Sequence, residues 1–462
     1  MTVEGTIAPT MRLRGSILLA GCLFSGQAAA SPDPQGSKIT TSRYNVDMFD
    51  GPVLSSSRVT ALAGAYVPLA DGVEGLVVNP AAPAVRAPYS YSHFDYDVSL
   101  GFTFPSALAA TDFDNNGTTG FTYQKFVFFT VGGLVQIGQW GFGANVDARN
   151  YDLEQEAAPG KPLSVRLLRA HASLARNFFD AQLVVGIGFR FAGLDLTTTE
   201  ASATTSLLSM LGVAGEIGAV LAPHAWPFRF GVTARSPVSG GVDPNSTAKP
   251  DANGDLFLAG KYLPERVSLP WEVELGGAWQ LGRPINPPWV DPRQVSDAEV
   301  NAATVGQQAA EHGDPTNKKR WKRAEVVRRM LKARYESLPR ERLLVVAAVK
   351  ISGPVDDAVG VESFLAQIVD RSGRRTTYTP RLGLEGEPLG HYLQLRLGTY
   401  LEPTRFDVNQ GPRLHGTFGF DVRVLTWDVF GLFDEGTGFR IGGMVDGARQ
   451  YFGWGITAGI FH

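Results

Sequence analysis

The residues best spaced for metal chemistry are Asp112, Asp114 and Asn116, which precede Gly117. Carboxylate and amide oxygens at alternating positions before a turn glycine are typical of the start of a calcium-binding loop. The twelfth position of such a loop should hold a bidentate Glu, but here it holds Tyr123. The segment is therefore a weak calcium candidate, the alternative is an exposed turn rich in Asp and Asn, and we predict no metal site.

The seven histidines show no zinc-protease spacing, and the chain has no GxSxG turn and no phosphate-binding loop. His171 and His415 fall on strand faces predicted to line a lumen, so a serine–histidine pair across two strands stays open as an alternative. The sequence otherwise predicts no enzyme and no cofactor.

Arginines recur on the same predicted lumen faces, where they could steer a carboxylate headgroup. The alternative is a structural network in which they pair with acidic side chains such as Asp147, Glu272, Glu274 and Asp421. Arg229 and Arg235 share these faces. The predicted polar lumen residues are Arg149, Arg169, His171, Arg190, Arg396, His415 and Arg423.

The composition limits the class of protein that could carry these residues. The chain has 462 residues, 44% hydrophobic and 19% charged, and its net charge of −3 argues against nucleic-acid binding. A single cysteine, Cys22, excludes a disulfide framework and a thiolate metal site. No apolar run of about 18 residues follows the first thirty positions, so no transmembrane helix is predicted. A large soluble β protein and a membrane barrel remain.

The amino terminus predicts export. Arg12 and Arg14 precede an apolar run over 15–24 and an alanine-rich site, which together are typical of a secretory signal peptide cleaved after Ala30. The alternative is lipidation at Cys22, because Leu19-Ala20-Gly21-Cys22 is similar to a bacterial lipobox.

Beyond residue 88 the chain repeats segments of alternating apolar and polar residues, closed by Gly, Pro, Asp or Asn. Most are as long as the ~9–11 residues that a tilted strand needs to span a bilayer, and their polar faces carry charges that suit a wet lumen. Short connections alternate with long polar loops. The predicted strands cover 88–104, 121–137, 140–153, 164–177, 181–196, 207–222, 228–237, 265–281, 341–353, 375–385, 391–402, 413–424, 427–440 and 448–462.

These segments predict an all-β fold, a transmembrane antiparallel β-barrel of about 14 strands. The alternative is a soluble sandwich of two open sheets. We expect a signal peptide over 1–30, a plug over 31–87, strands one to eight over 88–281, a periplasmic insertion over 282–340 and strands nine to fourteen over 341–462.

The insertion is predicted to contain one basic amphipathic helix over 316–337. Apolar residues recur there at helical spacing, and nine Lys and Arg residues surround them against two acids, Glu325 and Glu336. The alternatives are a solvated cap on the barrel floor, a surface for anionic outer-membrane lipid headgroups and a contact with an acidic periplasmic partner.

The predicted plug contains a compact, apolar segment over 57–81. Asp71 could cap a short helix with Glu74 as its capping-box partner. Asn79 could cap a second helix that starts at Pro80. Because the segment is rich in small residues, it could fold inside a barrel.

The pattern Gly64-Ala65-Tyr66, Ala70-Asp71 and Asn79-Pro80-Ala81 resembles the amino-terminal hatch signature of the FadL/TodX family of outer-membrane transporters. The resemblance implies a fourteen-stranded barrel with a plug in the outer membrane of a Gram-negative bacterium. It also implies passive diffusion of long-chain fatty acids, other hydrophobic small molecules or lipid, without a cofactor. Gating by the hatch would fall to Gly64, Tyr66, Asp71, Asn79, Pro80 and Ala81. The PorV-type barrels of a secretion system, which carry exported protein, share much of this pattern and are the alternative.

Overall fold

The computed structural model describes residues 34–87, 90, 92–106, 111–200, 203–245, 247–311, 323–339, 342–389, 392–407, 411–424 and 438–461. The predicted signal peptide, with the alternative lipidation site at Cys22, lies outside these residues.

Fourteen strands form the wall of a closed antiparallel barrel, in which each strand pairs with the next along the chain. The wall closes because the first strand pairs with the last. The predicted barrel is therefore confirmed, and the open sandwich is excluded. The wall strands are β2 (Phe94–Phe104), β3 (Phe121–Ile137), β4 (Trp140–Gln155), β5 (Leu163–Phe178), β6 (Leu183–Glu200), β7 (Ala203–Leu221), β8 (Phe228–Arg235), β15 (Glu272–Gly282), β16 (Arg342–Ser352), β19 (Thr377–Leu389), β20 (Leu393–Glu402), β21 (Arg413–Val424), β22 (Gly438–Ala448) and β23 (Tyr451–Phe461).

Alternation along each strand separates an apolar outer face from a polar inner face. In β20, Leu395 and Leu397 are exposed, whereas Gln394 and Arg396, which alternate with them along the strand, are buried in the lumen. Exposed aromatic side chains lie at both rims of the wall, as they do in transmembrane barrels. They include Phe94, Trp140, Phe178, Trp226, Phe228 and Tyr392 at one rim and Tyr378 and Trp454 at the other.

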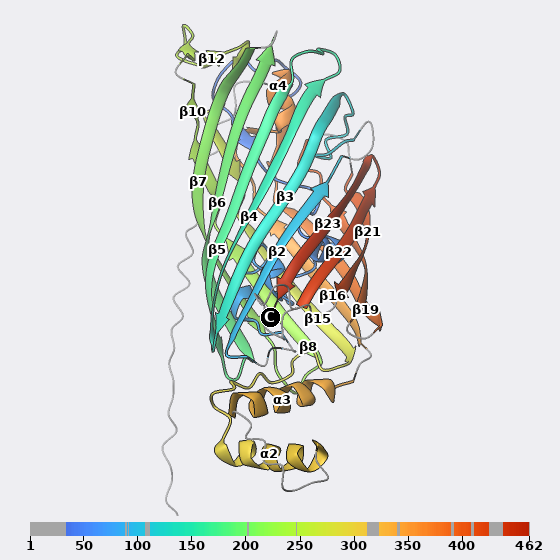
Figure 1. The fold of residues 1–462 in the computed structure, drawn as a ribbon. Coiled ribbons are helices and arrows are strands. Elements are labelled where there is room, and N and C mark those ends of the chain that lie inside the picture. The colour runs from blue at the N-terminus through green and yellow to red at the C-terminus, as the bar shows by residue number, and fades with distance from the viewer. Residues whose placement is uncertain are drawn as a thin grey trace, which may run out of the picture. The chain divides into compact units, whose positions relative to one another are not determined.

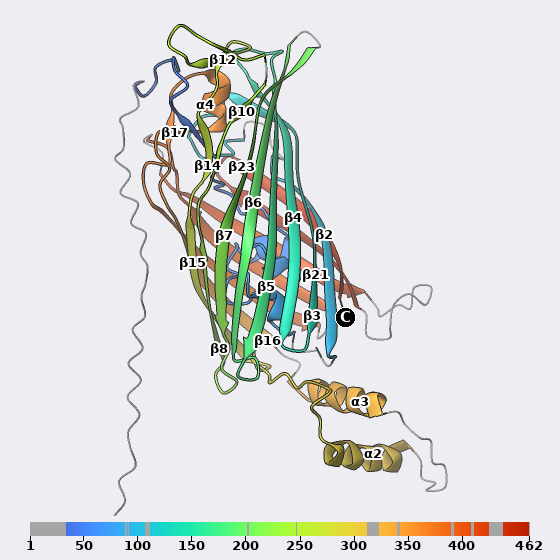
Figure 2. The ribbon, with the colours of Figure 1, turned by 90° about the vertical axis from the view of Figure 1, so that its left-hand side faces the viewer.

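The two ends of the barrel differ (Figures 1 and 2). We call the end with the long connections and α4 (Val361–Ala366) the loop end, and the end with the helical segment the insertion end. Smaller strands fill the loop end. A five-stranded sheet combines β9 (Val238–Gly241), β14 (Arg266–Leu269), β17 (Ala358–Val359) and β18 (Arg371–Ser372) with the amino-terminal β1 (Asn45–Asp47). The two-residue β10 (Asp243–Pro244) pairs with β7, and β11 (Lys249–Pro250), β12 (Leu256–Leu258) and β13 (Lys261–Tyr262) form a separate small sheet.

Two strand predictions are wrong. The segment 265–281 is not one strand, because β14 ends before Pro270 and joins the inner sheet, while β15 starts at Glu272 in the wall. Proline lacks the N–H that a ladder needs, so the strand breaks there. The thirteenth strand was expected over 427–440, but β22 covers Gly438–Ala448. The predicted short turn at Leu425 and Thr426 lies outside the described residues.

The insertion holds two helices where one was predicted. α3 (Arg323–Glu336) falls within the expected range of 316–337, and the unpredicted α2 (Asp297–Glu311) precedes it. Val326, Val327 and Leu331 of α3 form a small apolar core with Val295 and Val300. Among the described residues, no helix is both long and apolar enough to cross a membrane.

The amino-terminal segment folds inside the barrel. α1 (Ser57–Ala61) and the single 3₁₀ turns η1 (Val73–Gly75) and η2 (Ala82–Ala84) are buried along their whole length. The capping predictions are only partly right. The residue before η1 is Gly72, and Asp71 makes no cap. Asn79 accepts a hydrogen bond from the Ala81 N–H (3.0 Å), but the helical turn starts later, at Ala82.

Candidate functional site: the plugged lumen

Residues 57–87 of the predicted plug over 31–87 lie inside the barrel, and from here on we call them the plug. They contact the wall through backbone atoms and through side chains such as Asn79. Asn79 is fully buried, and its amide donates hydrogen bonds to the carbonyls of Val67 in the plug (3.0 Å) and Ala219 in β7 (3.3 Å). Tyr66 is also fully buried and donates to the Asp71 carbonyl (3.0 Å). These contacts fix the predicted hatch residues Tyr66 and Asn79 within one hydrogen-bonded turn structure.

Glycines on the inner face of the wall allow this close approach. A Cβ at Gly186 of β6 would overlap the Pro80 carbonyl, and one at Gly218 of β7 would overlap the Asn79 side chain. A Cβ at Gly231 of β8 would overlap the Val67 carbonyl. The wall therefore accepts the plug only where side chains are absent, which explains glycines at positions where a strand gains nothing from them.

Ion pairs also attach the plug to the barrel wall. Asp71, a predicted hatch residue, pairs with Arg229 of β8 (2.9 Å) and with Arg58 of α1 (3.6 Å). Arg58 pairs in turn with Glu385 of β19 (3.2 Å). Gly64 has a positive φ of 73°, and its carbonyl accepts a hydrogen bond from Arg381 (3.0 Å). Pro80 and Ala81 contribute backbone and packing only.

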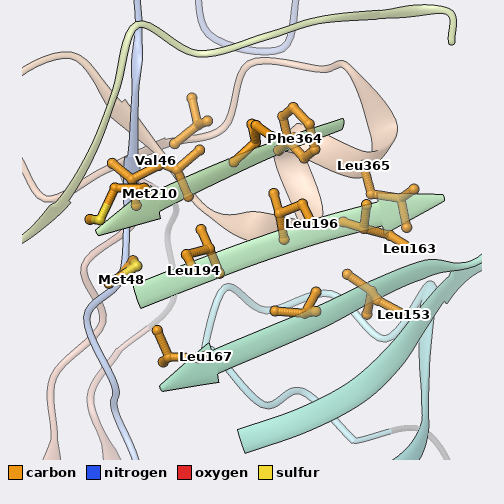
Figure 3. Packing of buried hydrophobic residues seen from close by; sticks show 14 of the residues in the cluster. Val46, Met48, Leu153, Leu163, Leu167, Leu194, Leu196, Met210, Phe364 and Leu365 are labelled. Carbon is orange, nitrogen blue, oxygen red and sulfur yellow. The ribbon is translucent and has the colours of Figure 1, made fainter. Parts of the chain in front are cut away.

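An apolar cavity lies above the plug, at the loop end. It measures about 630 Å³ and is lined mainly by apolar side chains such as Met48, Phe49, Val165, Leu167 and Leu194. The charged side chains of Asp47, Asp50, Asp114, Arg149 and Arg405 also line it. The same leucines belong to a large buried apolar cluster that spans β4 to β7, β1 and α4 (Figure 3). A cavity of this size and lining is typical of a site for a small hydrophobic molecule.

A charged chamber of about 890 Å³ lies on the lumen side of the plug and is lined by both acidic and basic side chains. The predicted lumen residues Arg169 and Arg190 line it, and these two, Arg149 and Arg396 each have a carboxylate partner. Arg149 (2.6 Å) and Arg169 pair with Asp50, Arg190 pairs with Glu272 (3.0 Å), and Arg396 pairs with Asp421 (2.8 Å). The chamber is thus a network of ion pairs, which is the structural alternative considered for the arginines.

The predicted lumen residue Arg423 lies near the insertion end. Its guanidinium stands over the Phe461 ring (5.5 Å) and lines a further cavity on the insertion side of the plug. Asp421, the partner of Arg396, lines the same cavity, so Arg423 lies near Arg396 and not in the chamber that holds Arg169, His171 and Arg190.

Both predicted lumen histidines bond to carboxylates. His415 is fully buried between Asp446 (Nδ1, 2.8 Å) and Glu402 (Nε2, 2.7 Å), and it stacks on Tyr400. His171 lies 3.1 Å from Glu216. Among the described residues, no serine is hydrogen-bonded to a ring nitrogen of His171 or His415. The geometry therefore offers no serine–histidine pair at these two positions.

The calcium-like segment folds as a turn at the loop end. The Asp112 carboxylate accepts hydrogen bonds from the N–H groups of Asn116 (3.0 Å) and Gly117 (3.1 Å), and the Asn116 amide donates to Glu362 of α4 (2.6 Å). Burial raises the pKa of Glu362 to about 7, and burial beside Glu362 raises the pKa of Asp114 well above its usual value. Across the described residues, no group of His, Cys, Asp or Glu is arranged to hold a metal ion.

Sequence reasoning missed several residues of the site. Asp50, Glu216 and Glu385 each bind one or more lumen arginines or histidines, although their positions give no local signal. The inward glycines carried a signal that could have been used, since they fall on the polar face of strands where larger side chains are expected.

No protein-family model matches the chain, and no curated protein is similar to its sequence. Solved structures are similar to it. A Pseudomonas aeruginosa FadL homologue is 10% identical with a TM-score of 0.49, over 90% of this chain and 99% of that one. The Ralstonia pickettii toluene transporter TbuX is 12% identical with a TM-score of 0.45, over 90% and 98%. The Pseudomonas putida toluene transporter TodX is 11% identical with a TM-score of 0.43, over 91% and 99%.

Proposed function

We propose that this protein is an outer-membrane channel for hydrophobic small molecules, such as long-chain fatty acids, with the loop end outside the cell and the insertion end in the periplasm. The main support for this proposal is the mainly apolar cavity of about 630 Å³ at the loop end of a closed, plugged barrel. Transfer of apolar surface from water into this cavity supplies the driving force, at about 25 cal/mol per Å². No chemical step and no cofactor are needed.

The lumen supports a sideways exit for an apolar ligand. The charged chamber and the plug lie below the cavity. Moving an apolar molecule into these charged surroundings is unfavourable in free energy. Beside the cavity the wall is interrupted, because β8 pairs with β7 only over Glu216–Leu221. On the same side of β7, β10 pairs with residues 208–209. Residues 210–214 of β7 lie between these two pairings and have no partner strand of the wall among the described strands. β9 covers the interruption, with Val238 packed against Gly212.

Gating belongs to this proposal as well. Movement of β9 would open the sideways route, and movement of the plug around Asn79 and Pro80 would open the axial route to the periplasm. The glycine contacts and buried ion pairs of the plug favour the first route, since β9 makes a smaller contact with the wall than the plug does.

Uptake by cells that lack their own transporter tests the proposal. We expect cells producing the protein to accumulate radiolabelled oleate or naphthalene faster than cells without it. Leu167→Arg places a charge in the apolar cavity and should lower uptake about tenfold. Ile368→Arg, at an exposed position of the same end, is the matched control and should leave uptake unchanged. Equal uptake with and without the protein, across a panel of hydrophobic compounds, would reject the proposal.

A further inference from the structure

The first residues of the insertion, 283–291, run across the insertion end beneath the plug, and we call this segment the strap. Arg229 of β8 joins the strap to the plug. Its guanidinium donates to the carbonyl of Ile285 (2.9 Å) and the side chain of Asn286 (3.0 Å), and also to the Leu69 carbonyl of the plug (3.0 Å). The Asn286 amide donates to the Phe228 carbonyl (2.7 Å), so the strap is also fixed to the wall.

A second set of contacts fixes the far end of the strap. The Arg86 guanidinium stands over the Trp289 ring at 4.4 Å and pairs with Asp95 at 2.5 Å. Asp291 pairs with His93, just before β2, at 3.1 Å. The strap is therefore attached at both ends, and the space between it and the plug has a defined shape.

This space is a cavity of about 510 Å³. Alkyl groups line much of it, including Val85 of the plug, Val184 of β6 and Val220 of β7. A neighbouring cavity of about 750 Å³ lies between the strap and α3, adds Leu331 and Leu338, and shares His224 with the first. The two cavities share Ser90, His224, Asn286, Pro287 and Pro288 in their linings, so one ligand could extend from the first into the second.

The charged side chains of both cavities have one sign. The lining includes Arg86, Arg229 and Arg334 together with His224, and among the described residues it includes no Asp or Glu. This differs from the chamber on the other side of the plug, where acids and bases alternate. Arg86 and Arg229 are already paired with Asp95 and Asp71, which lie outside the lining. Arg334 and the N–H donors of the lining are therefore the groups that an anionic ligand could bind.

Two buried nitrogen atoms point to the place of the anionic group. His224 Nε2 and Trp289 Nε1 have no hydrogen-bond partner among the described residues, and both side chains line the cavity beneath the plug. A buried polar group without a hydrogen-bond partner is unfavourable, so a ligand oxygen that accepts a hydrogen bond there would be stabilised. The indole N–H can only donate, and imidazole donates when protonated at Nε2.

We propose that the space between the strap and the plug binds a small amphipathic carboxylate. The carboxylate accepts hydrogen bonds from Trp289 and His224 near the Arg86 guanidinium, and the alkyl chain lies along Val85 and Val220 or toward Leu331. This site is separate from the apolar cavity at the loop end, and binding to it requires neither transport nor a moving plug.

Photolabelling of the full-length protein in lipid nanodiscs tests the proposal. The probe is decanoate with a diazirine in its chain, and labelled peptides are identified by mass spectrometry. We expect saturable labelling of the strap and of residues 220–226, competed by decanoate and much less by decan-1-ol. His224→Leu and Trp289→Phe should each reduce strap labelling about fivefold, a loss equivalent to ~1 kcal/mol. Trp226→Phe, an exposed tryptophan outside both cavities, is the matched control.

Each outcome has one meaning. Strap labelling that decanol competes equally well, or that persists in the His224→Leu/Trp289→Phe double variant, overturns the proposal. Labelling confined to the loop-end cavity also overturns it but agrees with the proposed transport function. Strap labelling with no labelling at the loop end supports the second site and counts against the loop-end cavity as the entry site.

Discussion

At the residue scale, the contact between the turn at Asp112–Gly117 and α4 should respond to pH. The pKa of Glu362 is raised from 4.5 to about 7, chiefly by burial, which outweighs the hydrogen bonds from Tyr123 and Asn116, so the folded state favours the protonated carboxyl. A raised pKa gives stability that is fully present below the unfolded value and is lost as the pH rises through the folded one. Amide exchange in residues 112–118, corrected for intrinsic rates, should therefore be about tenfold less protected at pH 8 than at pH 5.

Glu362→Gln should remove most of this pH dependence, because the amide cannot ionise. Glu325→Gln on α3, far from the loop end, is the matched control and should keep it. An equal pH dependence in the wild-type protein and Glu362→Gln would show that another group controls the contact. Since Asp114 and Glu362 both line or adjoin the apolar cavity, loosening of this contact would also widen the entrance.

At the scale of elements, β9 is the segment whose movement would open the wall beside β7. A Cβ at Gly212 would lie 2.5 Å from Val238 Cγ1, so cysteines at these two positions are close enough for a disulfide. In a Cys22→Ser background, oxidation of Gly212→Cys/Val238→Cys should stop uptake of a hydrophobic substrate, and a reductant should restore it. Each single cysteine variant is the control. Uptake that continues after complete oxidation would favour the axial route through the plug.

At the scale of the whole molecule, plug and wall are joined by backbone contacts, so one added methyl group should disturb both. Gly186→Ala would place a Cβ against the Pro80 carbonyl, and overpacking of this kind costs about 1–3 kcal/mol. We expect a higher ion conductance in planar bilayers, because a displaced plug opens the lumen. Gly193→Ala on the same strand meets only ordinary contacts, at 3.6 Å and beyond, and should conduct like the wild-type protein. Equal conductance of the two variants would indicate a plug that adjusts without opening the lumen.

The sequence by itself determined the barrel wall. Strand periodicity is a local property, because alternate side chains must face lipid or lumen wherever the strand lies. For this reason the bounds of β3 and β21 were predicted to the residue, over 121–137 and 413–424. The same local signal was ambiguous near 425–440, where apolar residues are frequent without strict alternation, and the thirteenth strand was misplaced there.

Only the tertiary structure decided which side chains form ion pairs and which strands form the inner sheet. The pairs Arg149–Asp50, Arg58–Glu385 and Asp291–His93 join residues about 99, 327 and 198 positions apart, so no spacing could reveal them. The inner sheet likewise exists only because β1 meets β14 and β17 inside the barrel. Closing the wall brings these segments together, and burial then requires each charge to find a partner. The cavities above and below the plug are consequences of that closure, and no local pattern in the chain specifies them.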